Sequence, residues 1–192
     1  WVGHGDGSVD RIDTATRAVT QVVKPVRASD KIKGSLPVSA LAHDKDGGLW
    51  IGTQGDGLFR LNASGGVVAH HENVQGRADS LGSNSVNAIL VSARGTVWIG
   101  TEEAGLARLV ADDRYEHVGA GPGERQLTDV RVSFLIEDKA GQLWIGTRNG
   151  LNRLNQETGH VDQFQAALTD PAGLSFNWLT SAHIDRDRVM WI

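Results

Sequence analysis

The residues best suited to bind a ligand follow three copies of one phrase, Trp-Ile-Gly-Thr, or flank a tryptophan outside it. They are Gln54, Asp56, Glu102, Glu103, Arg148, Asn149, Asn177 and Trp178. Amide, carboxylate and guanidinium groups can hydrogen-bond different sides of a polar molecule, and an indole can stack on a ring. Because this chemistry changes from copy to copy, we predict an asymmetric ligand site. Exposed turns also vary without selection, and Trp178 is equally compatible with a packing role.

Catalytic and metal-binding patterns are weak by comparison. The chain has no cysteine, which excludes disulfides, thiolate zinc sites and a cysteine nucleophile. His70 and His71 are adjacent, so on a strand they point to opposite faces and cannot share one metal. Glu102 and Glu103 are likewise adjacent, and a glycosidase pair would need a carboxylate from elsewhere. No nucleophile elbow, phosphate-binding loop or calcium loop is present. We predict no catalytic residue, no metal site and no cofactor.

The phrase that carries these residues repeats along the whole chain. Its tryptophans are Trp1, Trp50, Trp98, Trp144 and Trp191, which are 49, 48, 46 and 47 residues apart. A period of this length, with glycine-rich turns in every unit, is typical of repeat architectures.

One unit shows the expected strands. Apolar, β-rich runs at Val86–Val91, Val97–Thr101 and Leu106–Val110 are separated by turns that contain glycine, and a more polar strand follows at Tyr115–Val118. The first strands of other units are expected from Val38, Val132 and Leu179, and no helical periodicity is found. Four short antiparallel strands per unit predict an all-β fold, a β-propeller of four-stranded blades.

The chain holds about four blades and is interpreted as a fragment of a larger propeller. The predicted divisions are a partial blade at 1–34, blades at 35–83, 84–129 and 130–176, and the start of a further blade or a closing strand at 177–192. Polar connectors are expected near 24–36, 72–84, 119–129 and 165–177. Either the strand from Leu179 pairs with the strand from Trp1 to close a four-bladed ring, or the chain is an open arc.

Residues that recur at the same offset in every unit are expected to serve the fold. Trp50, Trp98 and Trp144 are predicted to pack between blades, since a buried aromatic removes 150–250 Å² from water. The strand glycines Gly52, Gly100 and Gly146 predict a close approach by a tryptophan or backbone of the neighbouring blade. The arginines of the third strands are expected to pair with carboxylates of neighbouring blades, and a ring of arginines around a ligand is the alternative. The residues concerned are Arg11, Arg60, Arg108 and Arg153, with Asp44, Asp138 and Asp185.

The combination of Leu-Trp-Ile-Gly-Thr with Gly-Leu-x-Arg-Leu resembles the two-component regulator propeller repeats, and the resemblance covers the entire chain. In that family, such repeats form periplasmic sensing domains of bacterial hybrid histidine kinases and of some sensor diguanylate cyclases. The resemblance implies a noncatalytic extracytoplasmic ligand-sensing module. Its partners would be a small-molecule or oligosaccharide ligand, the rest of the same receptor chain and, in some arrangements, a second copy in a homodimer.

Composition narrows the remaining alternatives. The net charge is −4 and the isoelectric point is about 6.0, which does not favour nucleic acid as a partner. No stretch of 18 or more apolar residues is present. Two other functions stay open. A propeller scaffold for protein contact or dimerisation would show a flat, apolar face at the channel, whereas a propeller lyase or glycosidase would bring carboxylates and histidines together on the axis.

Overall fold

The computed structural model describes residues 1–23, 36–119, 126–167, 169 and 173–192. Within these residues it contains seventeen β-strands and no helix, and therefore no helix able to cross a membrane. The connector predicted at 24–36 lies almost wholly outside the described residues. Residues 120–125 of the connector predicted at 119–129 also lie outside them, as do residues 168 and 170–172 of the one predicted at 165–177.

The strands form five antiparallel sheets that follow one another along the chain. The first sheet has three strands, β1 (Val2–Gly3), β2 (Val9–Ile12) and β3 (Val19–Val23). The second has four, β4 (Val38–His43), β5 (Leu49–Thr53), β6 (Leu58–Leu61) and β7 (Val67–His71). The third has β8 (Val86–Val91), β9 (Val97–Thr101), β10 (Leu106–Ala111) and β11 (Arg114–Val118). The fourth has β12 (Val132–Glu137), β13 (Leu143–Thr147), β14 (Gly150–Leu154) and β15 (Val161–Phe164). The last has β16 (His183–Ile184) and β17 (Met190–Trp191).

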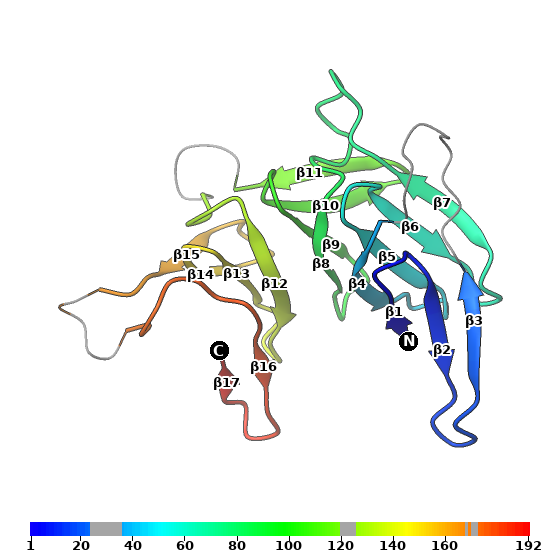
Figure 1. Ribbon diagram of the computed structural model, residues 1–192. Coiled ribbons are helices and arrows are strands. Elements are labelled where there is room, and N and C mark those ends of the chain that lie inside the picture. Colours follow the sequence, from blue (N-terminus) through cyan, green and yellow to red (C-terminus); the bar gives the residue numbers. More distant parts are fainter. Residues whose placement is uncertain (24–35, 120–125, 168, 170–172) are drawn as a thin grey trace.

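These sheets are the blades of a propeller, and Figure 1 shows them in an arc from the blue β1–β3 to the red β16–β17. We call the three four-stranded sheets blades 2, 3 and 4. Their first strands, β4, β8 and β12, pack against one another and therefore line the inner side of the arc. The all-β fold with four-stranded antiparallel blades predicted from the sequence is confirmed.

Of the two predicted alternatives, the strand pairing contradicts the closed four-bladed ring. β16 pairs with β17, and β1 pairs with β2, but β16 and β1 belong to separate sheets. The strand expected over 179–185 is also reduced to His183–Ile184. A strand extends only as far as a partner offers hydrogen bonds, and β17 contributes two residues. The described chain is an open arc.

The hairpins between first and second strands have the glycine chemistry expected of them. Gly47, Gly95 and Gly141 have φ values of +79°, +88° and +76°, in the left-handed region that glycine enters without steric cost. The corresponding residue between β16 and β17 is Arg188, which adopts a φ of +68°. A side chain there makes this last hairpin the least favourable of the four.

The predicted packing of the repeated tryptophans between blades is confirmed for Trp50 and Trp98, whereas Trp144 is only partly buried. Trp50 of blade 2 is 3% exposed and packs with Val86 and Tyr115 of blade 3. Trp98 of blade 3 is 2% exposed and packs with Val132 of blade 4. These two rings therefore fill the space against the following blade, and the core there is a series of interfaces between blades.

The strand glycines mark close approaches, but the approaching group is not the one expected. A Cβ on Gly52 would lie 2.6 Å from Cγ1 of Val86, and a Cβ on Gly100 would lie 2.4 Å from Cγ1 of Val132. The neighbour is thus a valine at the start of the next blade's first strand, and not a tryptophan or backbone. At Gly146 the close neighbour is Phe134 of the same blade.

The expected pairing of third-strand arginines with neighbouring blades is also wrong. Strand register places Arg60 opposite Trp50 in the same sheet, where its guanidinium lies 5.4 Å from the centre of the indole ring. Arg60 then pairs with Asp44 of its own blade, Nε to Oδ2 at 2.7 Å. Arg108 and Arg153 repeat the arrangement over Trp98 and Trp144, with Glu116 and Asp162 as their carboxylate partners.

Two of the expected carboxylate partners have another role. Asp138 accepts a hydrogen bond from Nε1 of Trp144 at 2.9 Å, and Asp185 accepts one from Nε1 of Trp191 at 2.7 Å. Each aspartate therefore binds the tryptophan of its own repeat, and not an arginine of a neighbouring blade as predicted.

Candidate functional site

Three buried threonines shape the turns that follow the second strands. The hydroxyls of Thr53, Thr101 and Thr147 donate to carbonyl oxygens across the turn, at 2.9, 3.0 and 2.8 Å. Each hydroxyl also accepts a backbone N–H from within the turn, at 3.0–3.2 Å. The repeated threonine thus fixes the residue that comes directly after it, which is where the predicted binding residues begin.

These turns are joined to the connectors that lead into the next blade. The backbone N–H groups of Gly55 and Gly57 both donate to the carbonyl of Asn84, at 2.9 Å each. In the next repeat, the N–H of Gly105 donates to the carbonyl of Val130, which precedes blade 4, at 2.9 Å. Turns and connectors therefore share one face of the arc, next to the inner strands.

A cleft of about 470 Å³ opens where these segments meet. It is lined by Gln54, Ser85, Asn87, Glu102, Ser133, Arg148, Trp178 and Thr180. The lining comes from blades 2, 3 and 4 and from the segment before β16, so no single blade could form it. We call it the axial cleft.

A carboxylate in the lining of the axial cleft, that of Glu102, is held by two blades. Oε1 of Glu102 lies 2.7 Å from Nη2 of Arg148, which belongs to blade 4. Oε2 of Glu102 accepts a hydrogen bond from Nδ2 of Asn87 at 2.8 Å, and the same amide donates to the carbonyl of Val132 at 3.1 Å. Both side chains of the ion pair are partly exposed, at 30% for Glu102 and 39% for Arg148, and their remaining hydrogen-bonding capacity faces the cleft.

An exposed indole forms one wall of the axial cleft. Trp178 is 58% exposed, although tryptophan is usually well buried in a folded domain. The guanidinium of Arg148 lies 5.7 Å from the centre of the Trp178 ring, within the range of a cation–π contact. Arg148 therefore connects the carboxylate to the aromatic wall.

The structure brings four of the eight predicted residues to the axial cleft, namely Gln54, Glu102, Arg148 and Trp178. The other four make local contacts outside its lining. Glu103 accepts from the Ser83 hydroxyl at 2.9 Å. Asn149 donates to the Thr128 carbonyl at 3.4 Å, and Asn177 accepts the Ala166 N–H at 2.5 Å.

Asp56 is the fourth predicted residue outside the axial cleft. It lies in the β5–β6 turn, near His70 and Glu72 at the end of β7. Its carbonyl oxygen is 2.7 Å from Nε2 of His70.

Sequence reasoning missed the polar residues of the inner strands. Asn87, Ser133 and Thr180 occupy the second position of their first-strand segments, where Ser39 stands in blade 2. The signal was available, because a polar residue recurs there within otherwise apolar strands. Part of its role is structural, since Ser39 donates to the carbonyl of Val86 in the next blade, as Asn87 does to that of Val132.

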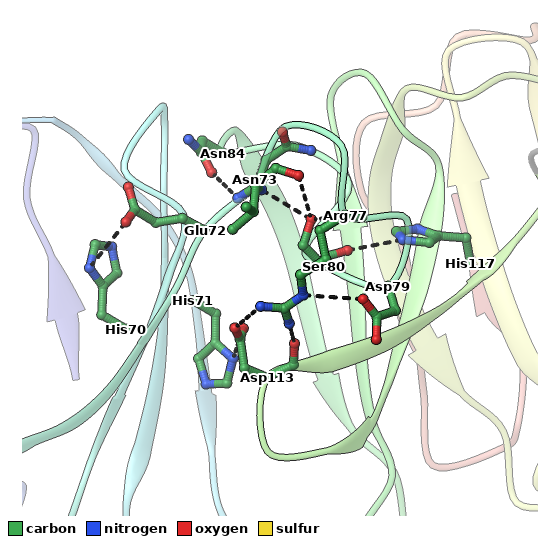
Figure 2. A network of polar contacts seen from close by, with 11 residues as sticks. His70, His71, Glu72, Asn73, Arg77, Asp79, Ser80, Asn84, Asp113 and His117 are labelled. Atoms are coloured by element: carbon green, nitrogen blue, oxygen red, sulfur yellow. Dashed lines mark hydrogen bonds and ion pairs between the residues drawn. The ribbon is translucent and has the colours of Figure 1, made fainter.

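A polar network holds the connector that runs from blade 2 to the axial cleft (Figure 2). Nη1 of Arg77 lies 2.9 Å from Oδ2 of Asp113 in the β10–β11 turn, and Nε of Arg77 lies 3.1 Å from Asp79. His71 contacts the same Asp113, Nδ1 to Oδ1 at 3.1 Å. The connector is thereby tied to blade 3 shortly before it reaches Ser85.

His71 in this network has a perturbed acid–base equilibrium. Its side chain is 5% exposed between Trp50 and Tyr115. Burial lowers the pKa of the His71 imidazole below its ordinary value, and the neighbouring Asp113 opposes that shift only in part. The lowered pKa favours the neutral form of His71 at the interface between blades 2 and 3.

A larger hollow, of about 700 Å³, lies between blade 4 and the β16–β17 hairpin. Its walls include Trp144, Leu151, Phe164, Met190 and Ile192. It exists because a two-stranded sheet covers less of blade 4 than a four-stranded blade would. Its lining also includes Asp138, Lys139, Gln163, Gln165 and Arg188. We regard the axial cleft as the better candidate for specific recognition because its lining joins variable positions of successive repeats.

The described residues define a propeller of four-stranded blades with a polar cleft beside its axis. The model of the two-component regulator propeller family matches three stretches of the sequence, residues 33–55, 80–103 and 126–149. The chain therefore carries repeats of the two-component regulator propeller family. No curated protein sequence matches it.

Several solved structures share the fold at low sequence identity. The extracellular domain of BT3049 from B. thetaiotaomicron, assigned as a hybrid two-component system, is 19% identical with a TM-score of 0.66, over 90% of this chain and 23% of that one. That of BT4673 from the same organism, assigned as a one-component system, is 18% identical with a TM-score of 0.58, over 98% and 30%. A catalytically inactive virginiamycin B lyase from Staphylococcus aureus, solved with quinupristin, is 16% identical with a TM-score of 0.66, over 98% and 56%. The chain thus spans a quarter to just over half of these proteins, and identities this low show the fold alone.

Proposed function

We propose that this chain is a noncatalytic ligand-sensing propeller module from the periplasmic, extracytoplasmic part of a bacterial membrane receptor. The observation that carries the proposal is the axial cleft, whose lining differs in chemistry at equivalent positions of successive repeats. The match of the sequence to the two-component regulator propeller family supports the same assignment. So does the structural similarity to extracellular domains of two-component systems.

The cleft favours a polar ligand with at least one ring. The carboxylate of Glu102 is a negatively charged hydrogen-bond acceptor, and the guanidinium of Arg148 is a positively charged donor. The amide of Gln54 can donate or accept a hydrogen bond. Trp178 supplies an exposed aromatic face. An oligosaccharide or a small polar metabolite meets these requirements, because hydroxyl groups bind the polar set while a ring stacks on the indole.

Ligand binding in the axial cleft would bias the propeller between two states. A molecule that touches Gln54, Glu102 and Trp178 at once contacts blade 2, blade 3 and the segment before β16 together. It therefore stabilises one arrangement of these blades over another, by its difference in affinity for the two. In the proposed receptor, the rest of the same chain, in one copy or in a homodimer, carries this shift to a kinase or diguanylate cyclase output.

Two alternative functions fit the cleft less well. A lyase or glycosidase is suggested by the similarity to virginiamycin B lyase, but the cleft lining among the described residues has Glu102 as its one carboxylate and holds no histidine. Glycoside hydrolysis ordinarily uses two carboxylates. A scaffold without a small ligand would favour a flat apolar face in place of a polar cleft.

A thermal-shift screen against glycans and polar metabolites tests the proposal, since a ligand that binds only the folded state raises the melting temperature. We expect a hit whose shift disappears in Trp178→Ala. Trp191→Ala is the matched control, because Trp191 is 62% exposed but lies outside the cleft. Equal loss of the shift in both variants, or no hit from a broad library, would contradict the ligand-sensing function and favour the scaffold function.

A further inference from the structure

The end of β7 brings three side chains with metal-ligand chemistry together, away from the lining of the axial cleft. Asp56 lies in the β5–β6 turn, His70 on β7 and Glu72 directly after it. One donor atom from each lies within 4.8 Å of the other two. Strand register explains the proximity, because Leu58 pairs with His71 and so the turn before β6 reaches the end of β7.

The alternation of the strand places the right pair on one face. His70 and Glu72 are two residues apart and share a side of β7, whereas His71 points to the opposite side. Figure 2 shows His70 and Glu72 directed toward one another and His71 directed toward Asp113. Two adjacent histidines cannot share a metal, as the sequence indicated, but the histidine and the glutamate two residues on can.

The imidazole of His70 is already oriented as a metal ligand would be. Its Nε2 lies 2.7 Å from the carbonyl oxygen of Asp56. A carbonyl only accepts, so in the neutral ring Nε2 carries the proton and Nδ1 keeps its lone pair. The ring stacks on Phe59 with 4.0 Å between centroids and 5° between planes. Such fixing of tautomer and ring plane by the second nitrogen is usual for histidines that bind metals.

The spacing suits an ion better than a direct contact. Nδ1 of His70 is 4.0 Å from Oε2 of Glu72, too far for a hydrogen bond. Tetrahedral zinc–nitrogen and zinc–oxygen bonds of about 2.0–2.2 Å place the two ligand atoms roughly 3.4 Å apart, so a small movement of Glu72 toward His70 lets one ion reach both atoms. Glu72 is 48% exposed and can move closer. Among the described residues, neither Asp56 nor Glu72 pairs with a lysine or arginine, which leaves two negative charges for a cation to neutralise.

We propose that Asp56, His70 and Glu72 bind a divalent transition-metal ion of the zinc class, with Nδ1 of His70 as the nitrogen ligand. Calcium needs six to eight oxygens, and magnesium prefers oxygen and water, whereas zinc accepts one nitrogen and two carboxylate oxygens with water in a fourth position. The ion cross-links the β5–β6 turn to the end of β7. The same turn carries Gln54, so the ion also stiffens one edge of the axial cleft.

Zinc titration of the tag-free, EDTA-treated chain against a chromophoric zinc indicator tests the site. We expect one zinc ion per chain, with affinity reduced at least about tenfold in Asp56→Asn, His70→Gln and Glu72→Gln. Glu157→Gln is the matched control, since Glu157 is an exposed glutamate on a different blade and should leave affinity unchanged. The absence of zinc binding, or equal affinity in all four variants, overturns the proposal.

Two further measurements separate the metal site from folding and from ligand sensing. Because His70 stacks on Phe59, circular dichroism of each variant in EDTA reports any loss of fold, and the aspartate and glutamate variants, which lack that stacking role, decide the result. Cobalt in place of zinc gives a visible spectrum that should change in His70→Gln if a nitrogen ligand is lost. Repeating the glycan and metabolite screen in EDTA shows whether ligand binding survives without the ion, so the two proposals can fail independently.

Discussion

Arg108 and Arg148 make the same two kinds of contact in different places. Arg108 lies 5.8 Å from the ring centre of Trp98 in its own blade and pairs with Glu116 of that blade. Arg148 lies 5.7 Å from the ring centre of Trp178 in the following repeat and pairs with Glu102 of the preceding blade. The first arrangement recurs in blades 2 and 4, whereas the second occurs once among the described residues.

This difference separates what repetition does from what variation does. A contact within one blade can be copied into each blade, because each copy supplies both partners. A contact between unlike positions of successive blades depends on the particular residues on each side, so it exists only where they match. The repeated set of tryptophan, glycine, threonine and arginine forms the framework, and the variable positions beside the axis form the cleft.

Removing one framework tryptophan should cause the largest loss of folding stability. Trp98 is 2% exposed and fills the interface between blades 3 and 4. We expect Trp98→Ala to lower the free energy of unfolding by about 3–5 kcal/mol. Trp178→Ala, at a ring 58% exposed, should change it by no more than about 0.5 kcal/mol. Urea unfolding followed by circular dichroism measures both, and similar losses would remove the distinction between framework and cleft.

A single methyl group at a framework glycine should have the next largest effect. A Cβ at residue 100 would meet Cγ1 of Val132 at 2.4 Å and its Cβ at 2.9 Å. We expect Gly100→Ala to destabilise the fold by about 1–3 kcal/mol through overpacking between blades. Gly5→Ala is the control, because a Cβ there meets no atom within 4 Å. A Gly100 variant as stable as the control would show that the blades move apart without cost.

The sequence predicts the framework well because the signals are local. Strands β8 and β9 match their predicted ranges residue for residue, and the glycines of the hairpins have the positive φ expected. Alternation and turn chemistry act over a few residues and need no knowledge of the other blades. The partners of the arginines were mispredicted because strand register, which sets Arg60 opposite Trp50, is not visible in spacing alone.

The candidate site is only partly predictable. Gln54, Glu102 and Arg148 follow a fixed threonine, so the repeat itself gives their place. The directions of Glu103 and Asn149 depend on single hydrogen bonds within their loops, to Ser83 and Thr128, which no periodicity encodes. Asn87 was missed because one polar residue in an apolar strand does not disturb the strand pattern.

His71 gives a pH-dependent test of the framework. Its pKa is lowered in the folded state by burial, so between the ordinary value of about 6.5 and the lower folded value the unfolded chain binds more protons. The contribution of His71 to the free energy of unfolding is therefore fully present above pH 6.5 and is lost as the pH falls through this window. We expect His71→Gln to flatten the decline between about pH 7 and 5. The exposed His183→Gln should leave the decline intact, and an unchanged slope in both variants would exclude His71 as its source.

Neutralising Glu102, the carboxylate in the cleft lining, should have the smallest effect on stability. The ion pair between Glu102 and Arg148 is partly exposed, and pairs of this kind contribute about 0–1 kcal/mol. Glu102→Gln keeps an oxygen that can accept from Asn87 while it removes the charge. Urea unfolding in low salt should show a loss within that range, and the loss should shrink in high salt as the pair in the wild type is screened. A loss well above it would place Glu102 in the framework. A small loss of stability, accompanied by loss of the ligand-induced thermal shift, would show that the variable positions can change without damage to the blades, and that their chemistry serves recognition.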